Sequence, residues 1–349
     1  MNRATILPRR TVRYAPSFGL SRLFRPIPKF APRSSVKVEY VPNRGKGPKL
    51  EFHAWEEPGI PEQTLLLVLV ELADEALRAD KLACMLDASS DDGVGRHLWK
   101  ALQICSDADS PERTVRFETT WYELNRRCGY NTSGRSQRQR RQQLMRLCDI
   151  IVWEIEQDAR QTTTQSHLVA WMRGNSERVH LALNCRLAAS LLGERYVQIS
   201  LAERLTLRTD VAMALHATLS SMVKAGASME LNLDTAVEHV WPGSANNAPP
   251  GTHRRRRSAL RQALHEIGQL PAWTVEWPRS DKVLVCRRAT PRKGTLVHEK
   301  KKLKTAFSPR GTPSQQPLAD SSADVSGLFA SCTGSPTTCS GATLDLECA

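Results

Sequence analysis

The sequence has no apolar run of about 18 residues, the length that a helix needs to span a membrane. The nearest run, Thr64 to Val70, is ended by Glu71 and fits a soluble helix. The N-terminus also lacks the apolar stretch of a secretory signal. Its arginine-rich, acid-free composition imitates a mitochondrial transit peptide, but its prolines would break the amphipathic helix that such a peptide needs. These absences predict a cytoplasmic protein with no membrane partner.

The sequence has no Cys-x-x-Cys pair, and its nine cysteines are scattered and odd in number. Most of them lie within apolar patterns, where a free cysteine behaves as a small hydrophobic residue. We therefore expect reduced cysteines, no metal and no cofactor.

Motifs of enzymes that act on DNA are missing as well. There is no Gly-x-x-x-x-Gly-Lys-Ser/Thr segment for a Walker nucleotide site, and no His-x-His pattern to hold the metal of a nicking initiator or relaxase. His253 and Arg256 have the His-x-x-Arg spacing of tyrosine recombinases. That chemistry needs a tyrosine nucleophile further along the chain, however, and Tyr196 is the last tyrosine. The sequence therefore predicts a protein that is not an enzyme.

Positive charge is present in excess and is concentrated. The 49 Lys and Arg residues exceed the 36 Asp and Glu residues, which gives a formal net charge of +13. Three segments carry basic residues without any acid: Met1–Ser35 with eight, Tyr130–Cys148 with five and His239–His265 with five. Elsewhere acidic residues outnumber basic ones. Charge gathered in this way favours a nucleic-acid partner over an evenly basic surface.

The composition divides the chain into four predicted parts. Residues 1–35 are rich in Pro and Arg without periodicity, which indicates a flexible basic arm. Residues 291–349 are rich in Ser, Thr, Gly, Pro and Lys and are expected to be a disordered tail, either touching phosphates or solubilising the protein. Residues 36–193 and 194–290 each have the pattern of a domain of helices and short strands. The predicted fold class is α+β.

The first of these domains has the element order of a winged helix. Alternation predicts a β-hairpin at Val36–Tyr40 and Lys49–Trp55, and a helix follows from Pro61 to about Ala79. Ser89–Gly95 is expected to be a loop. The later elements are expected at strand Val115–Glu118, helices Trp121–Cys128 (capped by Thr120) and Arg135–Leu147, and strands Ile150–Ile155, His167–Trp171 and Val179–Leu183.

The second domain repeats this order, although no sequence identity links the two. Its elements are expected at helices Leu201–Leu205 and Thr209–Val223, strand Met229–Asn232, a helix capped by Asp234 that runs through Val240, a basic helix capped by Thr252, and a terminal hairpin of Trp273–Trp277 and Val283–Arg287. The hairpin would be the wing.

The basic helix after Thr252 combines the two properties of a DNA-recognition helix. An apolar stripe at Leu260, Ala263, Leu264 and Ile267 would hold it on its domain. Four consecutive arginines cover a full turn, so some must face phosphates, and arginine can also bind guanine bidentately. No acid lies within a dozen residues on the N-terminal side to pair with them. The predicted DNA contacts are Thr252, Arg254, Arg255, Arg256, Arg257 and Arg261.

The basic helix of the first domain has a similar division of faces. Leu144, Leu147 and Cys148 form the inward stripe, whereas arginines and glutamines occupy the other faces, and glutamine can read adenine. The same surface could contact only the DNA backbone or pack against a partner subunit, which leaves a homodimer open. The predicted DNA contacts are Arg135, Arg138, Gln139, Arg141 and Gln142.

Several short segments between Tyr196 and Val275 carry a family resemblance. They are Val197-Gln-Ile-Ser, Leu215-His, Val240-Trp-Pro, the four arginines from Arg254 with Leu260-Arg-Gln-Ala-Leu, and Trp273-Thr-Val. In these the chain resembles the RepC-type replication initiators of IncQ-like plasmids. Over residues 36–195 element order is kept more than residue identity, and both tails lie outside the match. The resemblance implies tandem winged-helix domains that bind direct repeats (iterons) at an origin, open the duplex and recruit a separate plasmid-encoded helicase and primase.

The sequence thus predicts a plasmid replication initiator that binds double-stranded origin DNA and opens an AT-rich duplex by binding energy, without ATP. The main alternative is a transcriptional repressor with the same two domains. The third hypothesis is a structural protein that coats DNA. The iteron sequence and length, the oligomeric state and the surface that contacts the helicase stay open.

Overall fold

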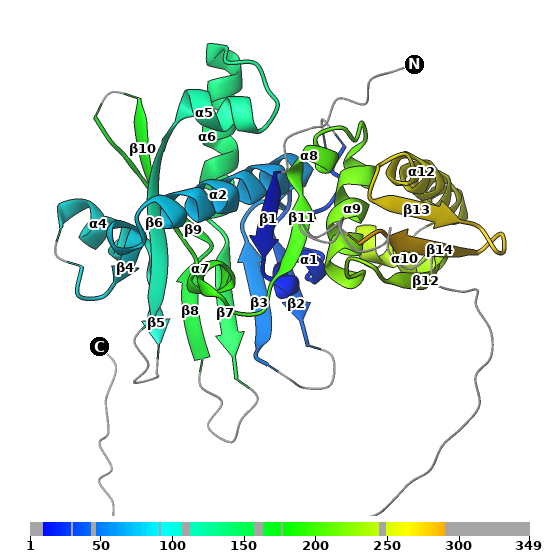
Figure 1. The fold of residues 1–349 in the computed structure, drawn as a ribbon, viewed down its shortest axis with the longest axis horizontal. Helices are drawn as coiled ribbons and strands as arrows, with labels where there is room; N and C mark the ends of the chain where they lie inside the picture. Colours follow the sequence, from blue (N-terminus) through cyan, green and yellow to red (C-terminus); the bar gives the residue numbers. More distant parts are fainter. Residues whose placement is uncertain are drawn as a thin grey trace, which may run out of the picture. The chain divides into compact units, whose positions relative to one another are not determined.

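Helices and short antiparallel strands follow one another along the chain (Figure 1). The computed structural model describes residues 10–28, 31–42, 47–90, 92–106, 112–156, 163–175, 177–243 and 249–289. All pairs between its named strands are antiparallel. The presence of both helices and strands confirms the predicted mixture of α and β structure. The predicted disordered tail, residues 291–349, lies outside the described residues.

The helix α2 (Ile60–Ala79) is the central element of the fold. It begins as predicted with Pro61 in its first turn, and the Glu62 carboxylate accepts a hydrogen bond from the backbone N–H of Gly59 at 2.9 Å. Every residue from Leu65 to Val70 is fully buried, because α2 packs against α6 (Gly134–Cys148), β6 (Arg113–Thr120) and β1 (Thr11–Tyr14). Burial on all sides explains the apolar run. None of the described helices is long and apolar enough to cross a membrane.

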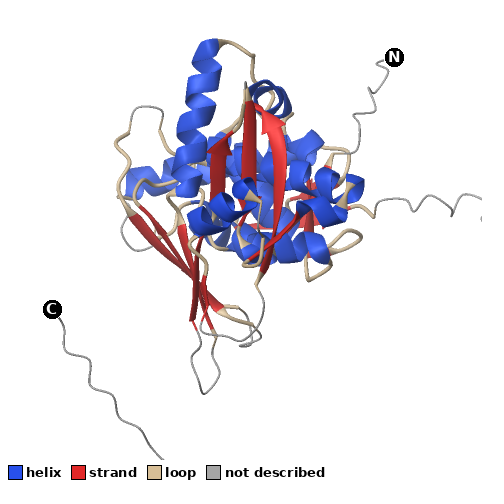
Figure 2. Cartoon of the chain, turned by 90° about the vertical axis from the view of Figure 1, so that its left-hand side faces the viewer, coloured by secondary structure: helices blue, strands red, loops and turns tan. Residues whose placement is uncertain are grey.

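Two sheets organise the first half of the chain. One has the strand order β4-β6-β10-β9, with β4 at Met85–Asp87, β10 at Arg178–Leu183 and β9 at Val169–Arg173. The other has the order β2-β3-β7-β8-β5, with β2 at Val36–Tyr40, β3 at Lys49–Ala54, β7 at Ile151–Ile155, β8 at Thr163–His167 and β5 at Cys105–Ser106. Figure 2 shows the strands with helices packed alongside them.

The predicted hairpin of β2 and β3 is confirmed, with Val38 opposite Phe52. The single strand predicted at His167–Trp171 is wrong. The chain changes sheets at the buried residue Leu168, so that β8 pairs with β7 and β9 pairs with β10. Apolar alternation runs through Leu168 and therefore hides the break.

Three helices of the first half were not predicted. They are α3 (Lys81–Cys84), α4 (Gly93–Leu102) and α7 (Cys185–Leu192). Helix α4 begins inside the segment expected to be a loop, because Asp92 caps it by accepting a hydrogen bond from the backbone N–H of Gly95 at 2.6 Å. Leu98 and Leu102 then bury α4 in a small separate core.

From Leu201 onward, the second half follows the predicted element order. It contains α8 (Leu201–Arg204), α9 (Asp210–Met222), β12 (Ser228–Asn232), α10 (Leu233–Val240), α12 (Pro250–Gly268), β13 (Trp273–Glu276) and β14 (Lys282–Arg287). Its sheet has the strand order β12-β14-β13.

The predicted flexible arm over residues 1–35 is wrong for residues 10–28. Strand β1 pairs with β11 (Val197–Ser200), and helix α1 (Pro16–Leu20) packs against α9. Val12, Tyr14 and Phe18 are at most 1% exposed. These apolar residues stand between the prolines and arginines, and Pro16 occupies the first turn of α1, where proline is tolerated.

The N-terminal segment also joins the two halves. Strand β1 precedes the first half in sequence but pairs with a strand of the second. The buried Arg204 of α8 donates hydrogen bonds to Thr64 and Gln63 of α2, at 3.1 and 2.9 Å. The described residues 10–289 accordingly fall within one compact unit, and these contacts cross the boundary expected between residues 193 and 194.

Candidate nucleic-acid interface

The two consecutive helices predicted in the first half, at Trp121–Cys128 and Arg135–Leu147, are present. Thr120 caps α5 (Trp121–Arg127) as predicted, accepting a hydrogen bond from the backbone N–H of Glu123 at 3.1 Å. Gly129 then takes a positive φ of 75° in the turn, a conformation that glycine adopts without strain. Ser133 caps α6 by accepting from the backbone N–H of Ser136 at 3.3 Å.

Helix α6 buries one face and exposes its basic face. Leu144 and Leu147 are fully buried as predicted, whereas Cys148 is half-buried. All five predicted DNA contacts are exposed, so the structure brings them together on the outward side of one helix: Arg135, Arg138, Gln139, Arg141 and Gln142. The guanidinium of Arg141 also lies beside the Trp171 ring, with Cζ 5.6 Å from the ring centroid.

Arg140 is the residue of α6 that the sequence reasoning missed. It is only 1% exposed, and its Nε and Nη1 atoms have no hydrogen-bond partner in the described part of the chain. The helical period contains the signal, because Arg140 lies four residues before the inward-facing Leu144. Arg140 therefore belongs to the inward face of α6 rather than to its exposed basic face.

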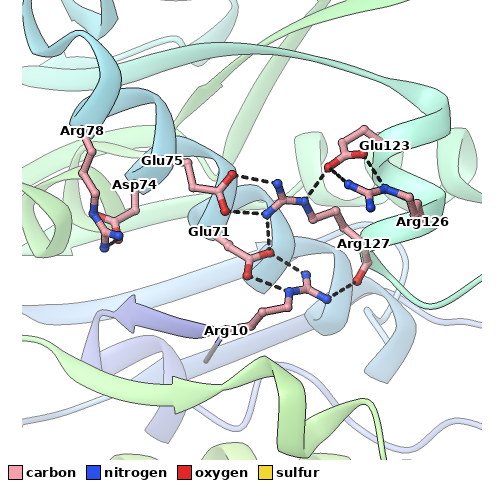
Figure 3. Close-up of polar contacts among 8 residues, drawn as sticks. All are labelled: Arg10, Glu71, Asp74, Glu75, Arg78, Glu123, Arg126 and Arg127. Carbon is pink, nitrogen blue, oxygen red and sulfur yellow. Dashed lines mark hydrogen bonds and ion pairs between the residues drawn. The ribbon is translucent and has the colours of Figure 1, made fainter. Parts of the chain in front are cut away.

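A network of ion pairs fixes α5 to α2 and to the start of β1 (Figure 3). Arg127 of α5 contacts Glu75 of α2 at 2.6 Å and Glu123 at 2.6 Å. Arg10 contacts Glu71 of α2 at 2.5 Å and donates a hydrogen bond to the backbone carbonyl of Arg127 at 3.1 Å. Helix α5 is thus held by charges that lie far apart in the sequence.

Helix α12 begins three residues earlier than predicted. Its N-cap is Pro249 and Pro250 is its first residue, because the fixed φ of proline suits the first helical position. Thr252 is therefore not the cap. It lies half-buried in the first turn, where its backbone N–H donates to the carbonyl of Pro249 at 2.9 Å.

The two faces of α12 match the prediction in part. The apolar stripe is confirmed, since its four members are all fully buried: Leu260, Ala263, Leu264 and Ile267. Arg254, Arg255 and Arg261 are exposed, and Arg261 also donates to the carbonyl of Ser280 at 3.1 Å. Arg256 and Arg257 are half-buried on the side of the apolar stripe, and the Cζ of Arg256 lies 5.5 Å from the ring centroid of Trp241.

The expectation that no acid pairs with these arginines is wrong for Arg257. Its Nη1 lies 3.2 Å from a carboxylate oxygen of Asp234, and Nε2 of His253 lies 3.5 Å from the same oxygen. The packing of α10 against α12 supplies this carboxylate from 23 positions away. Asp234 is also not the cap of α10, because Asn232 accepts the hydrogen bond from the Asp234 backbone N–H at 2.8 Å.

Several exposed arginines of α6 and α12 are not engaged in ion pairs that would stabilise the described part of the fold. Among the described residues, Arg135, Arg138, Arg254 and Arg255 take part in no ion pair. Exposed cations of this kind add little to stability, and they are available to phosphate groups. The chain therefore presents two separate basic helix surfaces.

The comparison with protein families assigns the chain. A family described as Replication protein C (RepC) matches residues 9–288. The chain belongs to this family. The RepC match begins at residue 9, in agreement with the packing of residues 10–28 into the fold. RepC membership identifies a protein of DNA replication, as the resemblance in the second half predicted.

Two solved structures were found to be similar. Domains 2 and 3 of RctB, as selenomethionine derivatives, show a TM-score of 0.47 and 10% identity over 80% of this chain and 99% of that one. A second structure, of RctB domains 2–3, shows a TM-score of 0.46 and 10% identity over 78% of this chain and 97% of that one. No curated protein sequence matches the chain.

Proposed function

We propose that this protein initiates plasmid replication by binding direct repeats at the origin through α6 and α12. Binding would open a neighbouring AT-rich duplex, which a separate helicase and primase then enter. Membership of the RepC family supports this function. The observation that carries it is the presence of two helices that each pack through an apolar stripe and turn arginines outward.

Each half is proposed to be a winged helix, and the sheet topology supports this. The first half contains α2, β6, α5, α6, β9 and β10, with β10 between β6 and β9. The second contains α9, β12, α10, α12, β13 and β14, with β14 between β12 and β13. Strands β7 and β8 are additions to the first half. In the second half the basic helix α12 is followed directly by the hairpin strands β13 and β14. In the first half the added strands β7 and β8 stand between the basic helix α6 and the hairpin strands β9 and β10. In each half the hairpin and the basic helix would contact the same DNA.

The proposed mechanism has no catalytic step. Binding energy spent on a deformed duplex can open AT-rich DNA without nucleotide hydrolysis. Incubation with supercoiled origin DNA, magnesium or manganese, and ATP should therefore yield neither nicks nor phosphate release above background. A nick that disappears in a Tyr196→Phe variant would overturn this part of the proposal.

Footprinting on the DNA that flanks the gene separates the proposed initiator from its alternatives. An initiator protects tandem direct repeats. A transcriptional repressor, the alternative that uses the same two helices, protects a promoter palindrome. A DNA-coating protein gives no defined footprint. Protection of a palindrome or of no defined site would contradict the initiator function.

The two-helix arrangement makes a finer prediction about one repeat. Two recognition helices entering the major groove from one side of the duplex lie about 34–36 Å, or 10–10.5 bp, apart. Arg138→Ala/Arg141→Ala should then remove protection from one part of the repeat, and Arg254→Ala/Arg255→Ala from the other. Symmetric weakening of both parts by either pair, seen in hydroxyl-radical footprints, would instead indicate a homodimer on a palindrome.

A further inference from the structure

A cleft with a volume of about 680 Å³ lies where the two halves of the chain meet. Its walls come from the start of α1, the β2–β3 hairpin, the connection between α7 and β11, and the end of α9. No residue of α6 or α12 lines it. The volume is in the range of small-ligand sites, about 300–1,000 Å³. The cleft is thus a candidate site distinct from the proposed DNA-binding surfaces.

The charge of the lining favours an anion. Among the described residues, four cations and one carboxylate line the cleft: Arg186, Arg195, Lys224, Arg287 and Glu194. Arg186 is balanced by Glu154 at 3.2 Å and by Glu194 at 3.6 Å. Arg195 and Lys224 are exposed and form no ion pair within the described residues. The cleft therefore has two cations whose charge the protein leaves unbalanced.

Arg287 adds a fixed positive group at the end of α9. It donates hydrogen bonds to the backbone carbonyls of Ser220, Val223 and Gln198, at 3.2, 3.3 and 2.7 Å. Burial lowers the pKa of Arg287, while the nearby carboxylate of Glu203 opposes that shift. The guanidinium is thus held rigidly in the wall, with backbone oxygens as its direct contacts.

A buried hydroxyl in the wall has no partner. Ser220 is 2% exposed, it lines the cleft, and its Oγ accepts and donates no hydrogen bond within the described residues. The adjacent Ser221 differs, because its Oγ donates to the carbonyl of Ala217 at 2.9 Å. The Ser220 hydroxyl is closed to solvent, so it offers no contact to a ligand in the cleft.

Two tyrosine rings complete the lining. Tyr40 comes from β2, and Tyr196 directly precedes β11. The Cζ of Arg13 lies 5.2 Å from the centroid of the Tyr196 ring. Burial raises the pKa of Tyr40, and the charge of Arg195 opposes that shift, which places Arg195 near the Tyr40 ring. Aromatic rings beside free cations are suited to a planar base that carries a phosphate.

We propose that this cleft binds a nucleotide, with its phosphate at Arg195 and Lys224 and its base against the tyrosines. The nucleotide is either a free mononucleotide or one unit of a DNA single strand, because both present the same phosphate and base. An acidic peptide would satisfy the cations but would leave the rings without a planar partner. The proposal involves binding without hydrolysis.

Titration of the full-length protein with separate probes tests the site. The probes are ATP and thymidine monophosphate by calorimetry, and a labelled ten-residue oligothymidylate and a labelled oligoglutamate by fluorescence anisotropy. The variants are Arg195→Ala/Lys224→Ala and Ser220→Ala. The control, Lys81→Ala/Lys100→Ala, removes the same charge from exposed positions of α3 and α4.

We expect the wild-type protein and the control to bind at least one nucleotide probe equally well. The Arg195/Lys224 variant should bind it at least about tenfold more weakly, because charge-assisted hydrogen bonds to the phosphate are lost. Ser220→Ala should bind it like the wild type, since that hydroxyl is closed to solvent. Selective weakening for the mononucleotides identifies a free nucleotide, and selective weakening for the oligothymidylate identifies a strand. Equal weakening in the control, no binding of any nucleotide probe at millimolar concentration, or cleft-dependent binding of oligoglutamate alone would overturn the proposal. Protection of the origin repeats should survive in the cleft variants, so this test and that of the proposed function fail separately.

Discussion

The guanidinium of Arg140 lies against the ring of Tyr130, with Cζ 4.0 Å from the ring centroid. Arg140 is 1% exposed, whereas Tyr130 is 41% exposed in the turn before α6. Because Nε and Nη1 of Arg140 lack hydrogen-bond partners among the described residues, the electron-rich face of the ring is a main compensation for burying this charge. The pair therefore ties the turn between α5 and α6 to the interior.

A double-mutant cycle measures this coupling. Arg140→Met should leave the free energy of unfolding nearly unchanged or raise it, since an apolar side chain of similar length replaces a poorly paired buried charge. Tyr130→Leu should destabilise the wild type more than it destabilises the Arg140→Met variant. The difference should be on the order of 2 kcal/mol in urea unfolding, the size of a desolvated cation–π interaction. Additive effects of the two substitutions would show that the ring does not compensate the charge.

The exposed arginines of α12 should govern affinity for DNA and its dependence on salt. Arg254→Ala/Arg255→Ala should weaken binding to the origin repeats and flatten the slope of log K against log salt by about 0.9 for each phosphate that the variant no longer neutralises. The Lys81→Ala/Lys100→Ala variant, with the same change in charge, should keep both affinity and slope. A folded α12 variant that binds with unchanged affinity and slope would remove α12 from the interface.

The N-terminal segment should contribute to stability as part of the core. Phe18 is 1% exposed and packs edge-on against Phe52, with ring centroids 5.1 Å apart. Phe18→Ala should therefore lower the free energy of unfolding by about 3–5 kcal/mol. Thr11→Ala, at an exposed position of β1, should change it little. If the Phe18→Ala and Thr11→Ala variants were equally stable in urea, this segment would not be part of the core and would instead behave as a flexible arm.

The buried His216 should make stability fall in mildly acidic solution. Burial lowers its pKa and the charges of Arg204 and Arg287 act in the same direction, while Glu203 opposes them. The unfolded chain takes up a proton near pH 6.5, whereas the folded chain does not until the pH is lower. Stability is thus fully present above about pH 6.5 and is lost as the pH falls below it.

Urea unfolding at pH 7.5 and 5.5 checks this prediction. The wild type should lose stability between the two pH values. A single titrating group such as His216 can lower the free energy of unfolding by at most about 1.4 kcal/mol per pH unit. His216→Gln should reduce the loss. Glu203 does not account for a change in this window, because hydrogen bonds from His216 and Trp273 outweigh its burial and hold its pKa below 4.5. An identical pH dependence in the variant would assign the effect to other groups.

Much of the local structure could be predicted because it depends on neighbours in the sequence. The stripe from Leu260 to Ile267 follows the helical period, and burial of that stripe is what holds α12. The Thr120 cap and the β2–β3 hairpin likewise depend on side chains within a few residues or on alternation along a strand. The five contacts predicted on α6 are exposed for the same reason, since they lie off its inward stripe.

The sequence by itself thus determined many of the helices and strands, the inward stripes of α6 and α12, and the exposed basic face of α6. Only the tertiary structure decided what each charge and each terminal segment contacts. Asp234 neutralises Arg257 because α10 packs on α12, and Glu71 holds Arg10 across 61 positions of the chain. Residues 10–28 are core because β11 offers β1 a strand to pair with. Periodicity reports the environment of a residue relative to its own helix or strand, whereas ion pairs and strand partners depend on which distant surfaces pack together.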